Sequence, residues 1–460
     1  MPNCTDPNIV CGWVSSDGNR GALNILWSCF STIWLCTWTS LCLNITDLRS
    51  NRGWRFIWYK FRWQLFAVFF PEVLVAAAAE QWVSARQSVA AFKSMEKPGG
   101  GEHEEEWTMR HAFFADMGGI MIAPRRSEHL FPVDAHQLAH LVRLGHLGRP
   151  RIPPDDIRAV NKADGLARVV TMGQMAWFCV NCVGRYAQGL SICPLELETL
   201  CFILCTTHTF FFWYHKPLDP VRAVILAADS TLDEICGPFR RHAPYKNTPL
   251  DFIKPPPDPK SLMVPFWFGF KVVFDHKSMR DHNPLPSTSS TSISLGTPRK
   301  QYDKAHRMPK TTIANSEITP PGGMSWPLTI YLLVFQLMYY GLHIIVGYQI
   351  SFPTHADLVL WEVSNIVDMV LIAIFVIALG LGTYFLPLIG RVAFGGRTPS
   401  TVMEAAELLP FWAKVLVHAP FVLGYIVARL LGLIEAAISL RALSSSVYSD
   451  VIWSNFIPHM

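Results

Sequence analysis

The chain has 460 residues, of which 50% are hydrophobic and only 16% are charged, and its mean hydropathy is +0.24. Soluble domains carry about a quarter charged residues, so this composition is typical of a multi-pass membrane protein. The formal net charge of +4 is small for this length, and the 16 Trp and 29 Phe suit lipid-facing and interfacial positions. These features exclude nucleic acid as a partner and make the lipid bilayer the expected one.

Seven apolar windows are long enough to cross a bilayer, whose core of about 30 Å requires about 20 helical residues. They lie near residues 21–43, 63–84, 170–190, 195–215, 326–348, 364–388 and 411–435. An eighth segment, 107–124, is short and is interrupted by Arg110, His111 and Asp116, so hydropathy alone predicts an interfacial or re-entrant segment. The predicted fold class is an all-α polytopic membrane protein, a bundle of seven to eight transmembrane helices with two long polar loops.

The windows divide the chain into regions of different character. In chain order these are an extracytoplasmic segment at 1–20, a first transmembrane hairpin at 21–84, a polar loop region at 85–168 that contains the short apolar segment 107–124, a second transmembrane hairpin at 169–216, a largely disordered cytosolic loop at 217–325, C-terminal transmembrane helices at 326–440 and a tail at 441–460. Disorder is expected in the cytosolic loop because residues 283–312 are rich in Ser, Thr, Pro and Lys and offer little apolar surface to offset the entropy of ordering.

The placement of Lys and Arg in the short loops predicts the orientation. Five basic residues follow the first window and only Arg20 precedes it, so the N-terminus should face away from the cytosol. The five are Arg49, Arg52, Arg55, Lys60 and Arg62. The connections at 191–194 and 351–361 contain no Lys or Arg and should lie outside as well.

Both inferences hold only if the chain crosses the membrane an even number of times between residues 62 and 168. Either 107–124 spans in addition to 63–84, or 63–84 dips into the membrane and returns at Pro71. The first option gives eight crossings with both termini outside, and it is the topology that we predict in preference to seven crossings.

Six stretches of the chain carry a family resemblance. They are STIWLCTWTSLCLNI, RWQLFAVFFPEVLVAAAAEQW, WTMRHAFFADMGG, KADGLARVVTMGQMAWFCVNCVGRYAQGL, LELETLCFILCTTHTFFFWYHKPLD and LHIIVGYQISFPTHADLVLWEVS. Together they resemble the landmarks of a large family of uncharacterised fungal multi-pass integral membrane proteins, over most of the chain outside 240–320. The resemblance implies a fungal membrane protein of unassigned function, and it implies no catalytic or ligand residue. The chain departs from the family at LHIIVGY, where the family tends to show LHLLAWN.

The N-terminal segment contains two candidate modification sites. Cys4 and Cys11 would face an oxidising compartment, where they can close a small disulfide loop. Asn3 begins the glycosylation pattern NCT on the same accessible side. The cysteines inside the apolar windows, including the CVNC of 179–182, are interpreted as packing residues.

The candidate metal ligands are His136 and His140, which are spaced to share one helical face. The sequence has no adjacent histidine pair of the kind that marks membrane di-iron enzymes, and it has no GxSxG nucleophile elbow. We therefore predict no cofactor and no catalytic residue, and His136 and His140 are the only metal-site candidates.

Charged and polar groups inside the apolar windows are costly and seldom face lipid. Glu72 follows Pro71 and lies ten residues after Arg62, about 15 Å deep if the helix is straight. Under a structural interpretation, Glu72 is protonated and bonds to a neighbouring helix. Under a functional interpretation it lines a polar cavity at a helix break, as in transporters. Arg185, His208 and His343 are its candidate mates, and Asp368 is a further intramembrane candidate.

Three functions follow from these patterns. Transport or sensing at a fungal membrane is the leading hypothesis. A membrane scaffold or receptor-like protein that acts through its Ser/Thr-rich loop at 286–319 is the first alternative. A membrane-embedded metal-dependent enzyme is the second.

Overall fold

The computed structural model describes residues 8–16, 20–45, 54–95, 106–126, 130–153, 157, 162–220, 222–237, 247–253, 263–274, 309–315, 324–347, 350, 352–393, 399 and 402–453. The helices are α1 (Ala22–Ser40), α2 (Trp54–Phe69), α3 (Pro71–Ser94), α4 (Met109–Asp116), α5 (Ala135–Arg143), α7 (Lys162–Ala187), α8 (Pro194–Phe212), α9 (Leu232–Cys236), α10 (Met263–Phe274), α12 (Trp326–Gly347), α13 (His355–Ala393), α14 (Val402–Leu408) and α15 (Phe411–Ile438). The strands are β1 (Ile9–Cys11), β2 (Ile120–Arg125), β3 (Phe131–Pro132), β4 (Val224–Thr231) and β5 (Ala442–Ser444).

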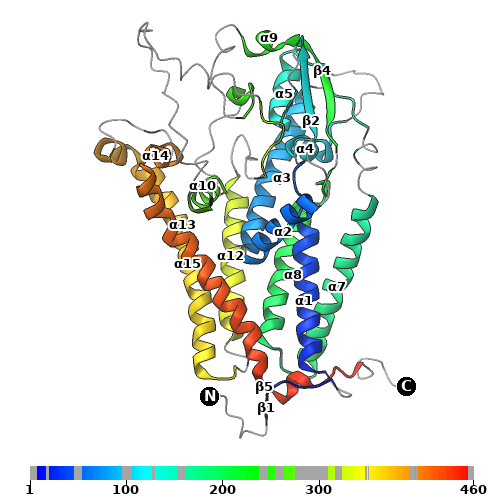
Figure 1. Ribbon diagram of the computed structural model, residues 1–460, viewed down its shortest axis with the longest axis vertical. Helices are drawn as coiled ribbons and strands as arrows, with labels where there is room; N and C mark the ends of the chain where they lie inside the picture. The colour runs from blue at the N-terminus through cyan, green and yellow to red at the C-terminus, as the bar shows by residue number, and fades with distance from the viewer. Residues whose placement is uncertain are drawn as a thin grey trace.

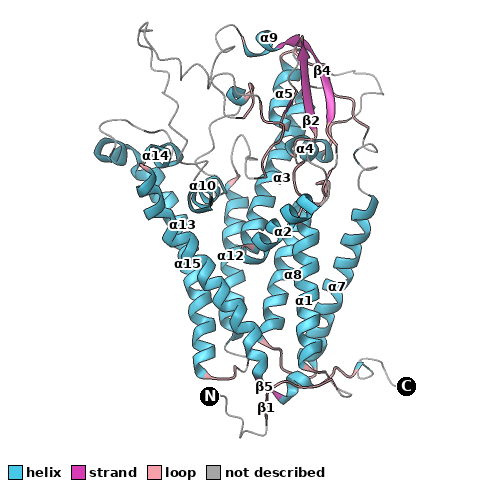
Figure 2. Cartoon of the chain, viewed as in Figure 1, coloured by secondary structure: helices cyan, strands magenta, loops and turns pink. Residues whose placement is uncertain are grey.

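Long apolar helices make up the body of the molecule (Figures 1 and 2). Among the described residues, five are long and apolar enough to cross a membrane, or six if the bent pair α2 and α3 counts as one span. The five are Gly165–Ala187, Pro194–Phe212, Trp326–Gly347, His355–Gly382 and Phe411–Arg441. The predicted count of seven to eight is not confirmed.

The helix α1 runs beside α7 and α8, and its 19 residues include no charged side chain (Figure 1). Each threonine hydroxyl of α1 donates a hydrogen bond to a backbone carbonyl one turn earlier. Thr32 donates to Ser28, Thr37 to Ile33 and Thr39 to Leu35, over 2.7, 2.8 and 2.7 Å respectively. A helix that satisfies its polar side chains internally can be surrounded by apolar groups.

A different small sheet lies at each end of the bundle (Figure 1). At one end, which we name the sheet end, β2 pairs antiparallel with β3 and parallel with β4. At the other, the terminal end, β1 pairs antiparallel with β5, and Ile9 lies opposite Ser444. Both described chain ends therefore lie at the terminal end of the bundle.

The segment 107–124 forms the short helix α4 and most of β2, and it does not cross the bundle. Both elements are buried at the sheet end, where Trp107 Nε1 donates to Ser88 Oγ over 3.0 Å. The Asp116 carboxylate accepts from Ser84 Oγ (3.0 Å) and from Ala135 N (2.9 Å), which ties α4 to α3 and to the start of α5. The eight-crossing prediction requires this segment to span, and it is not confirmed, because the segment holds only the eight-residue helix α4 and the strand β2. The apolar residues of the segment fill a small core, which includes Phe113, Ile120, Phe131 and Leu138.

The window 63–84 is broken at Phe70. The helix α2 ends at Phe69, α3 begins at Pro71, and the two are bent by 108°. Proline has no N–H to continue a helix and disfavours helical geometry in the residue before it, and Phe70 accordingly has φ −131° and ψ 52°. Both outer parts of the pair contact the sheet end, because Lys60 of α2 is paired with Asp219 and Ser88 of α3 bonds to Trp107. Both ends of the pair therefore lie toward the sheet end, an arrangement that is compatible with the second of the two options that the charge distribution allowed.

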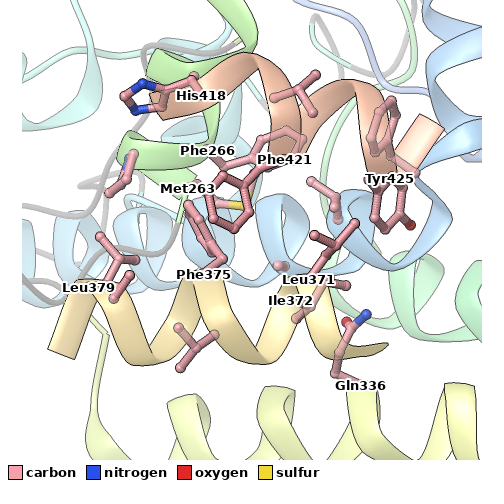
Figure 3. Close-up of a pocket in the computed structure, with 18 of the residues that line it drawn as sticks. Met263, Phe266, Gln336, Leu371, Ile372, Phe375, Leu379, His418, Phe421 and Tyr425 are labelled. Carbon is pink, nitrogen blue, oxygen red and sulfur yellow. The ribbon is translucent and has the colours of Figure 1, made fainter. Parts of the chain in front are cut away.

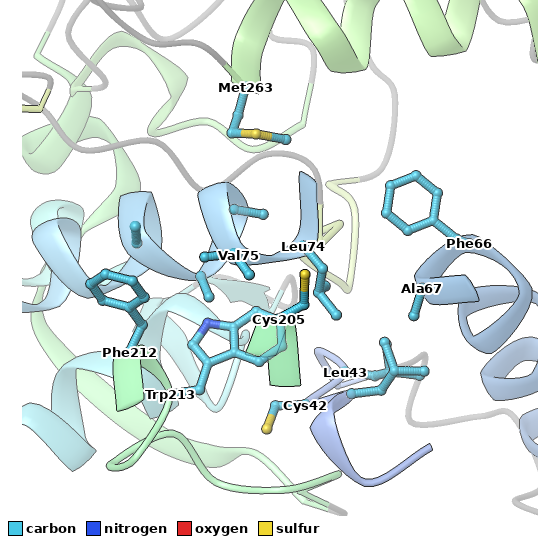
Figure 4. Close-up of a cluster of buried hydrophobic side chains, with 14 of the residues drawn as sticks. Cys42, Leu43, Phe66, Ala67, Leu74, Val75, Cys205, Phe212, Trp213 and Met263 are labelled. Atoms are coloured by element: carbon cyan, nitrogen blue, oxygen red, sulfur yellow. The ribbon is translucent and has the colours of Figure 1, made fainter. Parts of the chain in front are cut away.

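The predicted cytosolic loop 217–325 contains β4, α9 and α10. Residues 309–315 also pack on the body, since Asn44 N donates to Asn315 Oδ1 over 2.8 Å. Buried apolar side chains fill the space between α3, α8 and the end of α1 (Figure 4). Eight of the nine described free cysteines are buried, and Cys179 is half-buried. Cys11 is disulfide-bonded, whereas Cys4 and Asn3 lie outside the described residues.

A buried lysine lies at the sheet end, four residues beyond α8. Lys216 is 3% exposed, its Nζ donates to Gln81 Oε1 over 2.8 Å, and Nζ lies 4.2 Å from the centre of the Trp213 ring. Burial lowers the pKa of Lys216 to about 8, and the nearby acidic groups, Asp116 and Asp219 among them, only partly oppose this shift. The folded protein therefore disfavours the charged amine.

This lysine predicts a pH-dependent stability. The unfolded chain holds the Lys216 proton up to about pH 10.4, so between the two pKa values the unfolded state binds more protons and stability rises with pH. We expect the free energy of unfolding of the wild type to gain about 2 kcal/mol relative to Lys216→Met between about pH 7.5 and about pH 9.5. Denaturant unfolding in detergent at the two pH values measures the difference. Parallel pH profiles of the two proteins would contradict the prediction.

Candidate functional site

The break before α3 places Glu72 inside the bundle. Pro71 occupies the first position of α3 and Glu72 lies in its first turn, where unpaired N–H groups and the helix dipole favour an acidic side chain. Glu72 is 2% exposed. It contacts Tyr425, which lies halfway along the 28-residue helix α15. Glu72 therefore lies deep in the bundle.

Two tyrosines hold one oxygen of the Glu72 carboxyl group. The Tyr340 hydroxyl donates to Oε1 over 3.2 Å, the Tyr425 hydroxyl also donates to Oε1, and the two hydroxyl oxygens are 3.1 Å apart. The second oxygen, Oε2, is buried and has no hydrogen-bond partner among the described residues. The hydrogen bonds of Glu72 in the described part of the chain do not include the candidate mates Arg185, His208 and His343.

A buried ion network lies close to Glu72. Glu198 of α8 contacts His343 Nε2 of α12 over 2.6 Å and the Arg429 guanidinium of α15 over 2.7 Å. All three side chains are at most 3% exposed. Arg429 also donates to the Tyr339 hydroxyl, and the His343 carbonyl accepts from Trp361 Nε1 over 3.1 Å. Because an unpaired buried charge is strongly destabilising, this network fixes the relative positions of α8, α12 and α15.

Asp368 of α13 adds a third acid to this region. It is 2% exposed, lies within electrostatic range of Arg429, Glu72 and Glu198, and has no hydrogen-bond partner for Oδ1 in the described part of the chain. The three carboxyl groups face one guanidinium and the imidazole of His343. Net charge is costly in an apolar bundle, and three ionised carboxylates would outnumber the positive charges of Arg429 and a protonated His343. Protonation of a carboxyl group would reduce this excess of negative charge.

A cavity of about 410 Å³ adjoins Glu72, between α3, α10, α12, α13, α14 and α15 (Figure 3). Its wall is almost wholly apolar and includes Phe266, Phe375 and Leu379. The polar lining side chains are Glu72, Gln336, His418 and Tyr425. In Figure 3, Gln336 and Tyr425 lie toward one end and His418 toward the other. Gln336 Nε2 is buried and lacks a hydrogen-bond partner among the described residues.

A family model matches residues 1–238 and 329–460, which is more than half of the chain. The chain belongs to a family of unknown function, DUF8562. No curated protein and no solved structure matches it. The match to DUF8562 includes Glu72, Glu198, Gln336, Asp368 and Arg429, whereas α10, which forms one wall of the cavity, lies outside the matched ranges.

The other sequence-predicted residues of this DUF8562 chain lie apart from the cavity. Arg185 is 1% exposed and its guanidinium donates to carbonyls of Ser191 and of residues 446, 447 and 449, so it anchors the C-terminal segment. His208 Nδ1 bonds to the carbonyl of Leu204 in its own helix over 2.7 Å. His136 and His140 lie on α5 at the sheet end, and no three His, Cys, Asp or Glu side chains in the described ranges form a metal-binding group.

Several residues of the site were not identified from the sequence. Glu198 lies inside the window 195–215, and its carboxylate in an apolar stretch was the signal that could have identified it. Tyr340 and Tyr425 read as ordinary aromatic residues of apolar helices. Gln336 is a single polar residue in α12, and nothing in the sequence pairs it with Glu72.

Proposed function

We propose that the chain is a multi-pass protein of a fungal membrane that takes a small, largely apolar molecule into the cavity, for transport or sensing. The observation that supports this most is Glu72, whose carboxyl lines the cavity at a helix break and has a free oxygen. Broken helices with buried polar groups are where transporters bind substrates and protons. The neighbouring network of Glu198, Asp368 and Arg429 supplies groups that can respond to such binding.

The proposed topology has six crossings, made by the five helices of spanning length, α7, α8, α12, α13 and α15, together with α1, whose 19 residues include no charged side chain. Exposed apolar side chains on these helices, such as Leu337, Ile377 and Leu416 (59%, 58% and 67% exposed), would face lipid. The sheet end would be cytosolic, because it carries the basic residues of 54–62 and of 125–151. The re-entrant pair α2 and α3 adds no crossing, so both ends of the chain would lie outside.

This topology predicts the outcome of inserting glycosylation acceptors. Acceptors placed near Gly100 and near Pro153 should both stay unmodified, because α3 and α4 meet at the sheet end, whereas one placed near Trp13 should be modified. Gel mobility before and after deglycosylation reads out each site. If the acceptor near Gly100 is modified while the one near Pro153 is not, then 107–124 crosses the membrane.

A cavity-filling variant tests the proposed function. A panel of small amphiphiles should include compounds that raise the melting temperature of the purified protein, since a ligand stabilises the state that binds it. Ala76 lines the cavity one turn after Glu72, and Ala76→Phe should remove these shifts. Ala373→Phe is the matched control, because Ala373 lies on the exposed face of α13. If no compound shifts the wild type, or if Ala76→Phe retains every shift, the proposal fails.

A further inference from the structure

Two unpaired polar atoms lie in the wall of the cavity. Glu72 Oε2 and Gln336 Nε2 are both buried, and neither has a hydrogen-bond partner among the described residues. Buried polar groups in native proteins are nearly always hydrogen-bonded, so a pair of unsatisfied ones in a single cavity indicates the place of a ligand's polar group.

Both residues line the same cavity, one from α3 and one from α12. Gln336 lies four residues before Tyr340 on α12, so the two side chains share one face of the helix. The Tyr340 hydroxyl in turn bonds to Glu72 Oε1. The Tyr340 side chain therefore connects the parts of the wall that hold Gln336 and Glu72, and Figure 3 shows Gln336 on the same side of the cavity as Tyr425, which also bonds to Glu72.

The cavity wall offers one hydrogen-bond donor, Gln336 Nε2, and one acceptor, Glu72 Oε2, and a hydroxyl group can bond to both. A hydroxyl donates one hydrogen bond and accepts others, so it can accept from Gln336 Nε2 and donate to Glu72 Oε2. The rest of the wall, with Phe70, Phe266 and Phe421, offers only apolar contacts. We propose that the cavity binds a lipid alcohol, an uncharged hydrocarbon with a hydroxyl at one end; this rests on the ligand-binding function proposed above.

The charges around the cavity disfavour other head groups. A carboxylate or phosphate would lie beside Glu72, with Glu198 and Asp368 nearby. An ammonium group has no acceptor for Gln336 Nε2, and Arg429 lies close to Glu72. A hydroxyl also suits Glu72 with or without a bound proton, because it can donate or accept.

The test uses the purified full-length protein in lipid nanodiscs. Equilibrium binding of cholesterol and of hexadecanol is measured beside the methyl ether and the amine of each. The ether keeps the acceptor but cannot donate, so we expect the better-binding alcohol to exceed its ether by about tenfold in affinity. If cholesterol binds better than hexadecanol, the lipid alcohol is a sterol; if hexadecanol binds better, it is a fatty alcohol.

Variants of Glu72 and Gln336 test whether these two residues cause the preference for the alcohol over its ether. Glu72→Leu and Gln336→Leu should each bring the ratio of alcohol to ether affinity close to one, and Gln336→Met provides the same reading if Gln336→Leu does not fold. Gln64→Leu changes a buried glutamine of α2 outside the cavity, and it should retain the tenfold ratio.

The outcomes separate the two proposals. Saturable binding in which ether or amine equals or exceeds the alcohol overturns the lipid-alcohol assignment and leaves the ligand cavity standing. The absence of saturable binding of every probe, together with no thermal shift from the amphiphile panel, overturns both.

Discussion

Replacing Arg429 with methionine is expected to lower the free energy of unfolding by about 3–5 kcal/mol, because it leaves the buried Glu198 carboxylate with only His343 as a partner. Denaturant unfolding or thermal unfolding of the purified protein measures the loss. Methionine fills much of the volume of the arginine stem, so the effect reports on charge more than on packing.

Two further variants control this prediction. Arg441→Met removes an arginine that is 42% exposed and pairs with Asp357, and it should cost less than about 1 kcal/mol. The double variant Arg429→Met, Glu198→Met removes both charges and should recover much of the loss. If Arg429→Met is no more destabilising than Arg441→Met, the buried network does not hold the helices together.

Glu72→Gln and Glu72→Leu are expected to have different effects. Glutamine retains an acceptor for the Tyr340 and Tyr425 hydroxyls, and the protein should stay within about 1 kcal/mol of the wild type. Leucine leaves both hydroxyls without this acceptor, which should cost about 1–3 kcal/mol. Because glutamine cannot bind or release a proton, we also expect Glu72→Gln to fold normally and yet to show the phenotype of a deletion strain.

The matched control for Glu72 is Glu435→Gln, a buried glutamate of α15 outside the cavity that should be replaceable without loss of function. Thermal unfolding and complementation of a deletion strain are measured for all three variants. Full complementation by Glu72→Gln and Glu72→Leu with unchanged stability would show that Glu72 has neither a structural nor a functional role.

The sequence predicted the long helices and the burial of Glu72 for simple physical reasons. Long apolar stretches such as 326–348 and 411–435 form helices because backbone groups without water must bond within their own segment. The position of Glu72 in the middle of an apolar window likewise implied deep burial. These features depend on neighbouring residues in the chain, so one sequence is enough to predict them.

The topology was harder to predict because two solutions satisfied the same charge pattern. A span at 107–124 and a dip at Pro71 both give an even number of crossings between 62 and 168. The bend of 108° between α2 and α3 shows that Pro71 acts here as the start of a new helix. The placement of Lys and Arg requires only an even number of crossings, so it cannot separate these two cases.

The partners of Glu72 could not be predicted because they are distant in the chain. Tyr340 and Tyr425 lie 268 and 353 residues away. Which helices meet depends on packing across the whole bundle, and one sequence carries no direct record of it. Histidine and arginine were the natural candidates by charge, whereas the structure uses neutral hydroxyls for Glu72 and reserves His343 and Arg429 for Glu198.

The occupancy of the cavity is the most direct test of the proposed function. Wild-type, Ala76→Phe and Ala373→Phe proteins, purified in parallel, are extracted with organic solvent and the extracts are compared by mass spectrometry. We expect the wild type and Ala373→Phe to retain a small, largely apolar molecule close to one per chain, and Ala76→Phe to lack it. Equal extracts from all three proteins, with no molecule near that ratio, would contradict a ligand-binding cavity at Glu72.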